Sequence, residues 1–496
     1  MVGVPGRSQS CITCLGRKKG CDKQQPTCTQ CDKAGLTCGG YGRARVFVNR
    51  AQAGGHASTP YRTIARSTAT SAPDITLPFS LTQTAYNLRY VDLFWSAYLP
   101  GGKAFTADAM KLSIGGWINV AQDLYPTDRS LQLAMKCVSL CGVGTLYSDE
   151  SLMKQGLAAY TRCMQELNQA LRDPKRLKHD GILCTAKLLS LFEMHYGADD
   201  TDPQAQYRSW IAHAKGQLAI LGARQPQEFR SGKAHQLFSD YRYILVISAV
   251  GERKRFVIKG KGWKTIPWKS NRKSPRDKLL DILGDLAGVL EDIDNIDNCE
   301  NERIRDALGQ HITRSCWSLD GQLQSWIYEV GALKNFQNPN GGSDVLGPRD
   351  PQDFALAHLT ILYWATCTLL YANLLAFADS TTEMPARVDP FKYARELTLA
   401  LPFFFQPSAA IMGPKAAAFP LGLVMQVLCG TERTPSEHRV QLRRYFQTQG
   451  EGKNTAKFLM SLQRGSGSDG IGVQGGSQSV QAKATSWMNL KSRTAG

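Results

Sequence analysis

Residues 11–38 read CITCLGRKKGCDKQQPTCTQCDKAGLTC and place six cysteines at Cys11, Cys14, Cys21, Cys28, Cys31 and Cys38. The segment is the unit C-x2-C-x6-C written twice, with six residues between the copies. One tetrahedral zinc ion takes four ligands, and two separate ions take eight. Six sulfurs therefore suffice for two ions only if two of the sulfurs bridge both metals. The first cysteine of each copy, Cys11 and Cys28, is the natural bridging pair.

A disulfide framework is the alternative for so many cysteines in a short segment, and it is typical of secreted proteins. Residues 1–20 lack the uninterrupted apolar core of a signal peptide. The other eight cysteines are scattered through apolar helical patterns in the manner of buried thiols: Cys137, Cys141, Cys163, Cys184, Cys299, Cys316, Cys367 and Cys429. The spacing of the six therefore favours a metal site over disulfides.

Basic residues are distributed unevenly between the two copies. Two zinc ions and six thiolates carry a net charge of about −2, so the cluster itself repels phosphate and needs cations around it. The longer interval of the first copy holds Arg17, Lys18 and Lys19, whereas the same interval of the second copy holds Asp32 and Lys33, which cancel. We therefore expect the first copy to face a polyanion.

The segment resembles the Zn(2)-Cys(6) binuclear cluster of fungal transcription factors. The match includes the basic run at 17–19, Cys21-Asp22, and Pro26 in the loop that joins the halves; it departs at Leu15 and Gly20, where many members carry Arg or Lys. The resemblance implies a nuclear, sequence-specific DNA-binding transcription factor with two structural zinc ions. It makes Lys18 the base-reading residue and CGG-like triplets the half-site. Because the sequence lacks catalytic motifs, we also expect no enzymatic activity.

A short helix beginning near Cys14 is expected to enter the major groove and to present Arg17 and Lys18 there. The phosphate contacts that position the module are assigned to further basic residues: Arg17, Lys19, Lys23, Arg43 and Arg45. A solvated face or a nuclear-import signal is the alternative for the basic run. The alternative to DNA binding is a zinc-dependent interaction module that binds protein or RNA.

Composition divides the chain into five parts. We predict a disordered leader at 1–10, the zinc module at 11–49, a flexible linker at 50–81, an all-helical regulatory domain at 82–462 and a disordered tail at 463–496. The net charge of +17 suits a polyanion, and residues 1–73 carry eleven Lys or Arg against two Asp. No heptad repeat follows the cluster, so the protein either binds one half-site as a monomer or forms a homodimer through the larger domain.

Helical periodicity extends through most of the chain after Thr84. Segments are predicted at 131–147, 177–195, 204–221, 234–250, 276–293 and 303–328. One stripe, Met153, Leu157, Tyr160, Met164, Leu167 and Leu171, predicts a core-facing helix. Residues 354–378 contain no Asp, Glu, Lys or Arg, and we interpret them as a buried central helix and not a membrane span.

The large domain is similar to the fungal-specific transcription factor domain at two landmarks, 210–213 and 413–421. We expect this domain to regulate transcription at the sites that the zinc module binds, through contacts with the transcription machinery. A small-molecule sensor is the alternative function for this domain. Residues 253–278 are strongly basic and are interpreted first as a connecting loop, with nuclear import or a DNA surface as alternatives. The acidic run at 290–297 is interpreted as a helix end in preference to an activation segment. Phosphate-loop, HExxH and G-x-S-x-G motifs are all absent.

Overall fold

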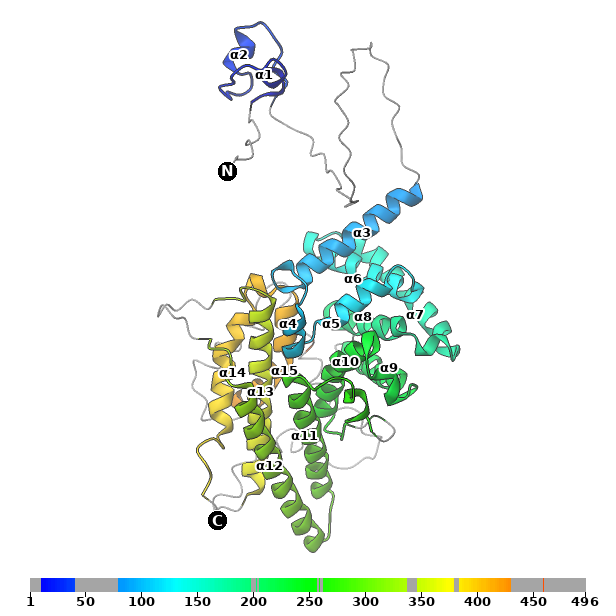
Figure 1. Ribbon diagram of the computed structural model, residues 1–496, viewed down its shortest axis with the longest axis vertical. Helices are drawn as coiled ribbons and strands as arrows, with labels where there is room; N and C mark the ends of the chain where they lie inside the picture. The colour runs from blue at the N-terminus through cyan, green and yellow to red at the C-terminus, as the bar shows by residue number, and fades with distance from the viewer. Residues whose placement is uncertain are drawn as a thin grey trace. The chain divides into compact units, whose positions relative to one another are not determined.

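The computed structural model describes residues 10–40, 79–197, 202, 205–256, 258, 262–336, 346–378, 383–429 and 458. The chain separates into two compact units, Met1–Ile75 and Thr76–Gly496. Every regular element in the described residues is helical (Figure 1). The predicted leader up to residue 9, most of the linker, the tail, Arg43 and Arg45 lie outside the described residues.

The first unit contains two short helices, α1 (Ile12–Gly16) and α2 (Thr29–Asp32), each directly after the first cysteine of its copy. The predicted start near Cys14 is wrong. Helix α1 begins earlier because Cys11 is its N-cap, with the Cys11 Sγ accepting a hydrogen bond from the Cys14 amide at 3.3 Å. Arg17 and Lys18 consequently lie in the turn that follows the helix.

The second unit is a helical domain whose predicted segments between 131 and 328 all appear within a few residues of their expected bounds. Its α-helices are α3 (Phe79–Tyr98), α4 (Ala107–Leu112), α5 (Gly116–Leu124), α6 (Arg129–Tyr147), α7 (Glu150–Arg172), α8 (Asp180–Tyr196), α9 (Ala205–Gly222), α10 (Gly232–Gly251), α11 (Pro275–Asp297), α12 (Glu302–Val330), α13 (Pro351–Phe377), α14 (Pro390–Phe404) and α15 (Met412–Cys429). Several begin at an Asp, Asn or Ser N-cap whose side chain accepts from the first turn: Asp128, Asp149, Ser274, Asn301, Asp350 and Asp389.

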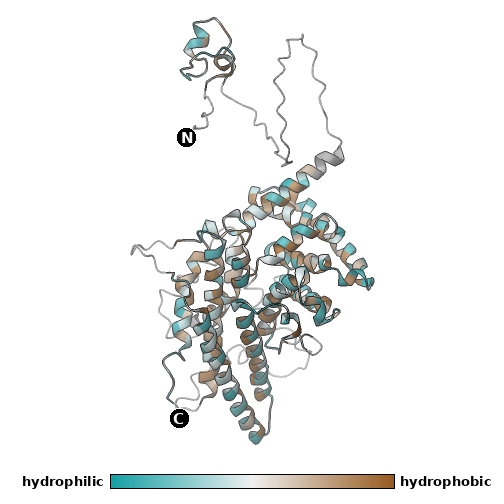
Figure 2. Cartoon of the chain, in the orientation of Figure 1, coloured by the Kyte–Doolittle hydropathy of each residue, from teal (hydrophilic) through white to brown (hydrophobic). Residues whose placement is uncertain are grey.

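Helix α13 is the central apolar helix. It contacts α12, α14 and α15 (Figure 1) and carries fully buried residues along most of its length. Among the described residues it is the one helix long and apolar enough to cross a membrane, yet 78% of its most apolar window is buried inside the protein. Helices on the outside of the unit are hydrophilic on part of their surface (Figure 2). The structure thus places 354–378 in the core, as predicted.

Helix α7 packs on α6 through small residues in addition to members of the predicted stripe. The fully buried positions of α7 are Gly156, Ala159, Cys163, Leu167 and Ala170. In the predicted stripe, Leu167 is buried, Leu157 is 49% exposed, and the other four members are partly buried and pack against the core. A Cβ atom at Gly156 would lie 2.3 Å from the Cys141 Sγ, so the two helices can approach this closely only with glycine there. The helix is core-facing, as predicted, and Gly156 makes its closest approach to α6.

The beginning of the basic segment at 253–278 pairs with the acidic run at 290–297. Arg253 contacts Asp294 at 2.7 Å, and Arg255 contacts Asp292 at 2.7 Å. Trp263 is buried against the core, as expected of a packed connector. The acidic residues belong to the last turns of α11. These contacts favour the connecting-loop and helix-end interpretations, because three of the four acidic residues in the run pair with Arg253, Lys254 and Arg255.

Candidate metal centre and nucleic-acid interface

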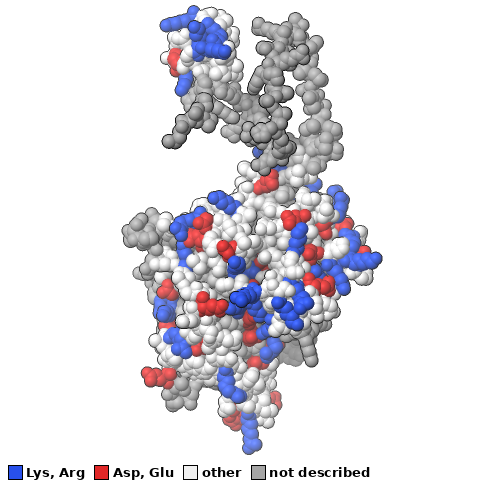
Figure 3. Space-filling view, in the orientation of Figure 1, with Lys and Arg blue, Asp and Glu red and all other residues white. Residues whose placement is uncertain are grey.

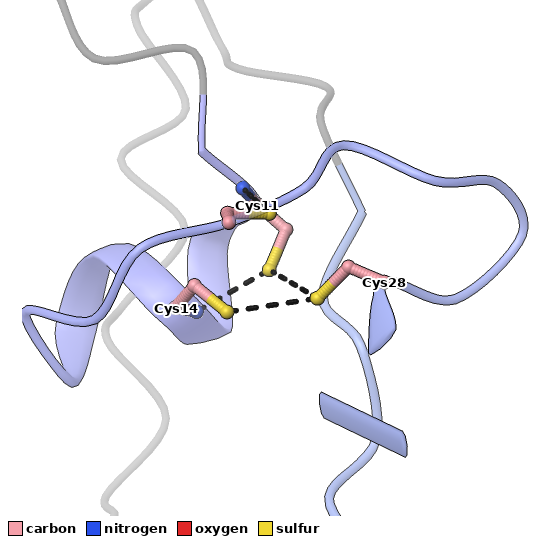
Figure 4. Close-up of side chains that lie close together, drawn as sticks. Cys11, Cys14 and Cys28 are labelled. Atoms are coloured by element: carbon pink, nitrogen blue, oxygen red, sulfur yellow. Dashed lines mark hydrogen bonds between the residues drawn. The ribbon is translucent and has the colours of Figure 1, made fainter. Parts of the chain in front are cut away.

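The cysteine sulfurs of the first unit converge on a small volume, and Figure 4 shows three of them, those of Cys11, Cys14 and Cys28. The Cys11 Sγ lies 3.7 Å from that of Cys28 and 3.7 Å from that of Cys31, and the Cys14 Sγ lies 3.6 Å from that of Cys28. Four sulfurs bound tetrahedrally at about 2.3 Å from a zinc ion lie about 3.8 Å from one another. The observed separations therefore fit the edges of zinc–thiolate tetrahedra and are far longer than a disulfide bond.

All six predicted cysteines are brought together, in two sets of four. One set is Cys11, Cys14, Cys21 and Cys28; the other is Cys11, Cys28, Cys31 and Cys38. Within each set the sulfurs lie within 4.8 Å of one another. The two sets share Cys11 and Cys28, the first cysteine of each copy. The donor set consists of thiols alone, which suits a soft or borderline cation such as zinc.

Backbone amides and burial act on the thiols in opposite directions. The Cys11 amide donates to the Cys21 Sγ at 3.4 Å. Amide hydrogen bonds lower the pKa of Cys38 to about 7, because they stabilise its thiolate. Burial raises the pKa of Cys31 to about 12 and also raises that of Cys14. A metal ion bound here would displace protons from the buried thiols, since the thiolate is the ligand form.

Two polar side chains tie the halves of the module together. Asp22, after the first copy, accepts hydrogen bonds from the Thr29 amide at 3.1 Å and from the Thr29 hydroxyl at the start of α2. Thr13 in α1 donates to the Thr37 carbonyl at 3.0 Å and accepts from the Gly39 amide at 2.9 Å. The sequence analysis assigned no role to these threonines, because a Thr between cysteines has no distinctive spacing. The halves are thus joined by side chains as well as by sulfur.

The two copies share a backbone conformation, with one difference in residue type. Lys18 (φ 54°) and Lys23 (φ 65°) occupy the left-handed region, and the residues 17 positions later, Gly35 (φ 59°) and Gly40 (φ 70°), do the same. Glycine adopts this region freely, whereas a residue with a Cβ atom pays about 1–2 kcal/mol. Aligning the two copies in the sequence would have paired Lys18 with Gly35 and Lys23 with Gly40. The first copy keeps lysine where the second has the unstrained residue.

The basic residues of the first copy, together with Lys23 just after it, form an exposed surface. Arg17, Lys18, Lys19 and Lys23 are all exposed, and Lys and Arg atoms gather on one side of the module in Figure 3. Among the described residues, no carboxylate lies within ion-pair distance of Arg17, Lys18 or Lys19. The surface therefore presents uncompensated positive charge beside the sulfur cluster, as a phosphate-binding surface must.

Comparison with known proteins gives one distant relative and one domain. An uncharacterized protein of Emericella nidulans is 23% identical over 188 residues, which cover 38% of this chain and 39% of the relative. The chain thus spans about two fifths of the length of that relative. No solved structure matches the chain. Residues 9–45 match the fungal Zn(2)-Cys(6) binuclear cluster domain. The chain therefore carries at its N-terminal end a zinc-binding cluster of the kind found in fungal DNA-binding transcription regulators.

Proposed function

We propose that the protein is a nuclear, zinc-dependent transcription factor that recognises CGG-like triplets in double-stranded DNA through the first copy of its cysteine motif. The observation that carries the proposal is the exposed, unneutralised run Arg17, Lys18 and Lys19 beside six converging sulfurs. Lys18 would contact the acceptor edge of guanine, and Arg17, Lys19 and Lys23 would contact phosphates. Arg43 and Arg45 would extend the phosphate contacts.

Two structural zinc ions would be held by the six cysteines. Cys11 and Cys28 would bridge the ions, because they belong to both sets of four sulfurs. Elemental analysis of the purified protein should give two zinc ions per chain; one ion per chain would contradict the bridged arrangement. A strong chelator should remove the ions and abolish DNA binding together, because the buried cluster in the described part of the module consists of cysteines.

Competition binding tests the specificity. A labelled CGG-containing duplex is competed with the same duplex carrying a permuted triplet, and with an RNA duplex of the same sequence. We expect the CGG duplex to compete at least about tenfold better, since one mismatched base pair costs about 1–3 kcal/mol. Lys33→Ala, an exposed lysine of the second copy, is the matched control and should retain this preference. Equal competition by all three nucleic acids would contradict sequence-specific DNA recognition, and preference for RNA would favour the rival module.

The helical unit would regulate the transcriptional activity of the protein once the zinc module has bound DNA. In this role it would resemble the fungal-specific transcription factor domain and would contact the transcription machinery. It would also provide the surface through which two chains form a homodimer. The two compact units support this division of labour. Light scattering of the full chain at binding concentrations distinguishes a dimer from a monomer that reads a single half-site.

A further inference from the structure

The later part of the basic segment lies against the beginning of α10. Asn271 donates through its side-chain amide to the Arg230 carbonyl at 2.7 Å. Trp268 contacts His235 edge-on, with 4.9 Å between the two ring centres. The loop between these two contacts therefore runs beside the start of α10, and basic residues from two separate parts of the chain meet at this corner of the helical unit.

Three basic residues at this corner have no acidic partner. Lys269 and Arg272 belong to the loop and are exposed, and Arg230 precedes α10 and is partly buried. Among the described residues, no Asp or Glu oxygen lies within 4.0 Å of any of the three side chains. The Arg230 Nε is buried and finds no hydrogen-bond partner in the described part of the chain. We call these three residues the α10 corner.

The carboxylates around the α10 corner are already occupied by other cations. The nearest acid in the sequence, Glu228, accepts from the Gln225 amide at 2.8 Å and contacts Arg224 at 3.6 Å. The surrounding ion pairs are Arg242 and Lys273 with Asp281, Arg276 with Asp240, Lys233 with Asp123, and Arg224 with Asp180. The α10 corner is therefore a local excess of positive charge at the surface.

The proposed function brings a polyanion to this surface. Residues 41–78 connect the described part of the zinc module to α3. A flexible chain of that length spans about 35 Å, which is about ten base pairs of duplex. DNA held by the zinc module would therefore meet the helical unit at an effective concentration on the order of millimolar. Uncompensated cations at such a concentration of duplex bind phosphates and release counterions.

We propose that Arg230, Lys269 and Arg272 form an accessory phosphate-binding surface for the duplex DNA that flanks the triplet. This inference rests on the proposed function and adds a second contact to it. The surface would add affinity without sequence preference, because phosphates carry no sequence information. It would also make the affinity depend on duplex length, since a duplex that ends close to the triplet offers its phosphates to the zinc module alone.

The test compares duplexes of about 12 and about 40 base pairs that carry the same triplet at their centre. The full-length zinc-loaded chain is titrated by fluorescence anisotropy at several salt concentrations. On the longer duplex, the loop variant, Lys269→Ala with Arg272→Ala, should lower the slope of log K against log salt by about two and weaken binding at least about fivefold, because each lost phosphate contact removes about 0.9 from the slope. On the shorter duplex it should bind as the wild type does.

Lys254→Ala with Lys264→Ala is the matched control. These two lysines are exposed and belong to the same basic segment, but they contact Glu291 and Asp285. The control removes as much charge as the loop variant and should keep the wild-type slope on both duplexes. Both variants should keep the wild-type Tm, because substitutions of exposed side chains change stability little.

Three results would overturn the accessory surface. The first is an unchanged slope on the longer duplex. The second is an equal change on both duplexes, which would place these cations beside the triplet. The third is loss of nuclear accumulation with an unchanged slope, which would assign the loop to nuclear import. The proposed function survives each of them if CGG is still preferred over permuted triplets; a wild type without that preference would overturn both.

Discussion

Replacing Lys18 by glycine separates the fold of the zinc module from its reading of DNA. Lys18 sits at φ 54°, and its counterpart in the second copy is Gly35 at φ 59°. Glycine relieves about 1–2 kcal/mol of left-handed strain but adds about 0.5–1 kcal/mol of entropy to the unfolded chain. The module of Lys18→Gly should therefore be as stable as the wild type or more stable by about 1 kcal/mol. Its zinc retention against a competing chelator should not decrease.

DNA recognition by the same variant should be impaired. Loss of one base-reading side chain costs about 1–3 kcal/mol, which is about 5- to 150-fold in Kd for a CGG-containing duplex. Lys18→Ala keeps the strained backbone and should lose the same discrimination, so the pair of variants isolates the side chain from the conformation. Fluorescence anisotropy against cognate and permuted duplexes measures both. If Lys18→Gly holds its zinc and keeps full discrimination, Lys18 does not read a base.

Three further predictions concern phosphate contact, pH and packing. Lys19→Ala should weaken binding to all duplexes alike and reduce the slope of log K against log salt by about one; a change confined to one triplet would contradict a phosphate role. Burial, with Arg276 nearby, lowers the pKa of His358 from 6.5 to about 3. Between these values the unfolded chain binds a proton that the folded chain does not, so the free energy of unfolding should fall on acidification by up to about 1.4 kcal/mol per pH unit. His358→Gln should make this fall shallower in denaturant titrations, and an unchanged slope would contradict it. Gly156→Ala should destabilise the helical unit by about 1–3 kcal/mol because its Cβ meets Cys141, whereas the exposed Leu157→Ala should change stability by less than about 0.5 kcal/mol; equal effects would refute the small-residue contact.

The cysteine spacing was enough to predict the sulfur cluster because all of its ligands lie close together in the sequence. The six residues lie within a 28-residue stretch, and tetrahedral geometry leaves few ways to share six sulfurs between ions. Long amphipathic helices such as α11 and α12 were predictable for a similar reason, since their caps and apolar positions are contained in the segment itself. Side-chain ties such as that between Asp22 and Thr29 were not, because no spacing rule singles them out.

Other features were missed because they depend on partners distant in the sequence. Helices α14 and α15 contain Pro402 and Pro420 inside their spans. From sequence alone a proline predicts the end of a helix, because it lacks the backbone N–H that the helix needs. Periodicity correctly predicted that α7 faces the core, but it counts large apolar residues and therefore missed the close approach of Gly156 to Cys141. The pairing of Arg253 with Asp294 joins two charge runs that the sequence presents as separate signals.

The two units are stabilised by different kinds of interaction. In the described part of the first unit the buried residues are four cysteines, while Ile12, Leu15 and Leu36 are 43–50% exposed, so sulfur and metal take the place of an apolar core. In the second unit one continuous cluster extends from Phe94 to Val424 and includes Phe458. Loss of zinc should therefore unfold the zinc module and leave the helical unit folded. DNA binding would then depend on the supply of metal, whereas the fold of the helical unit would not.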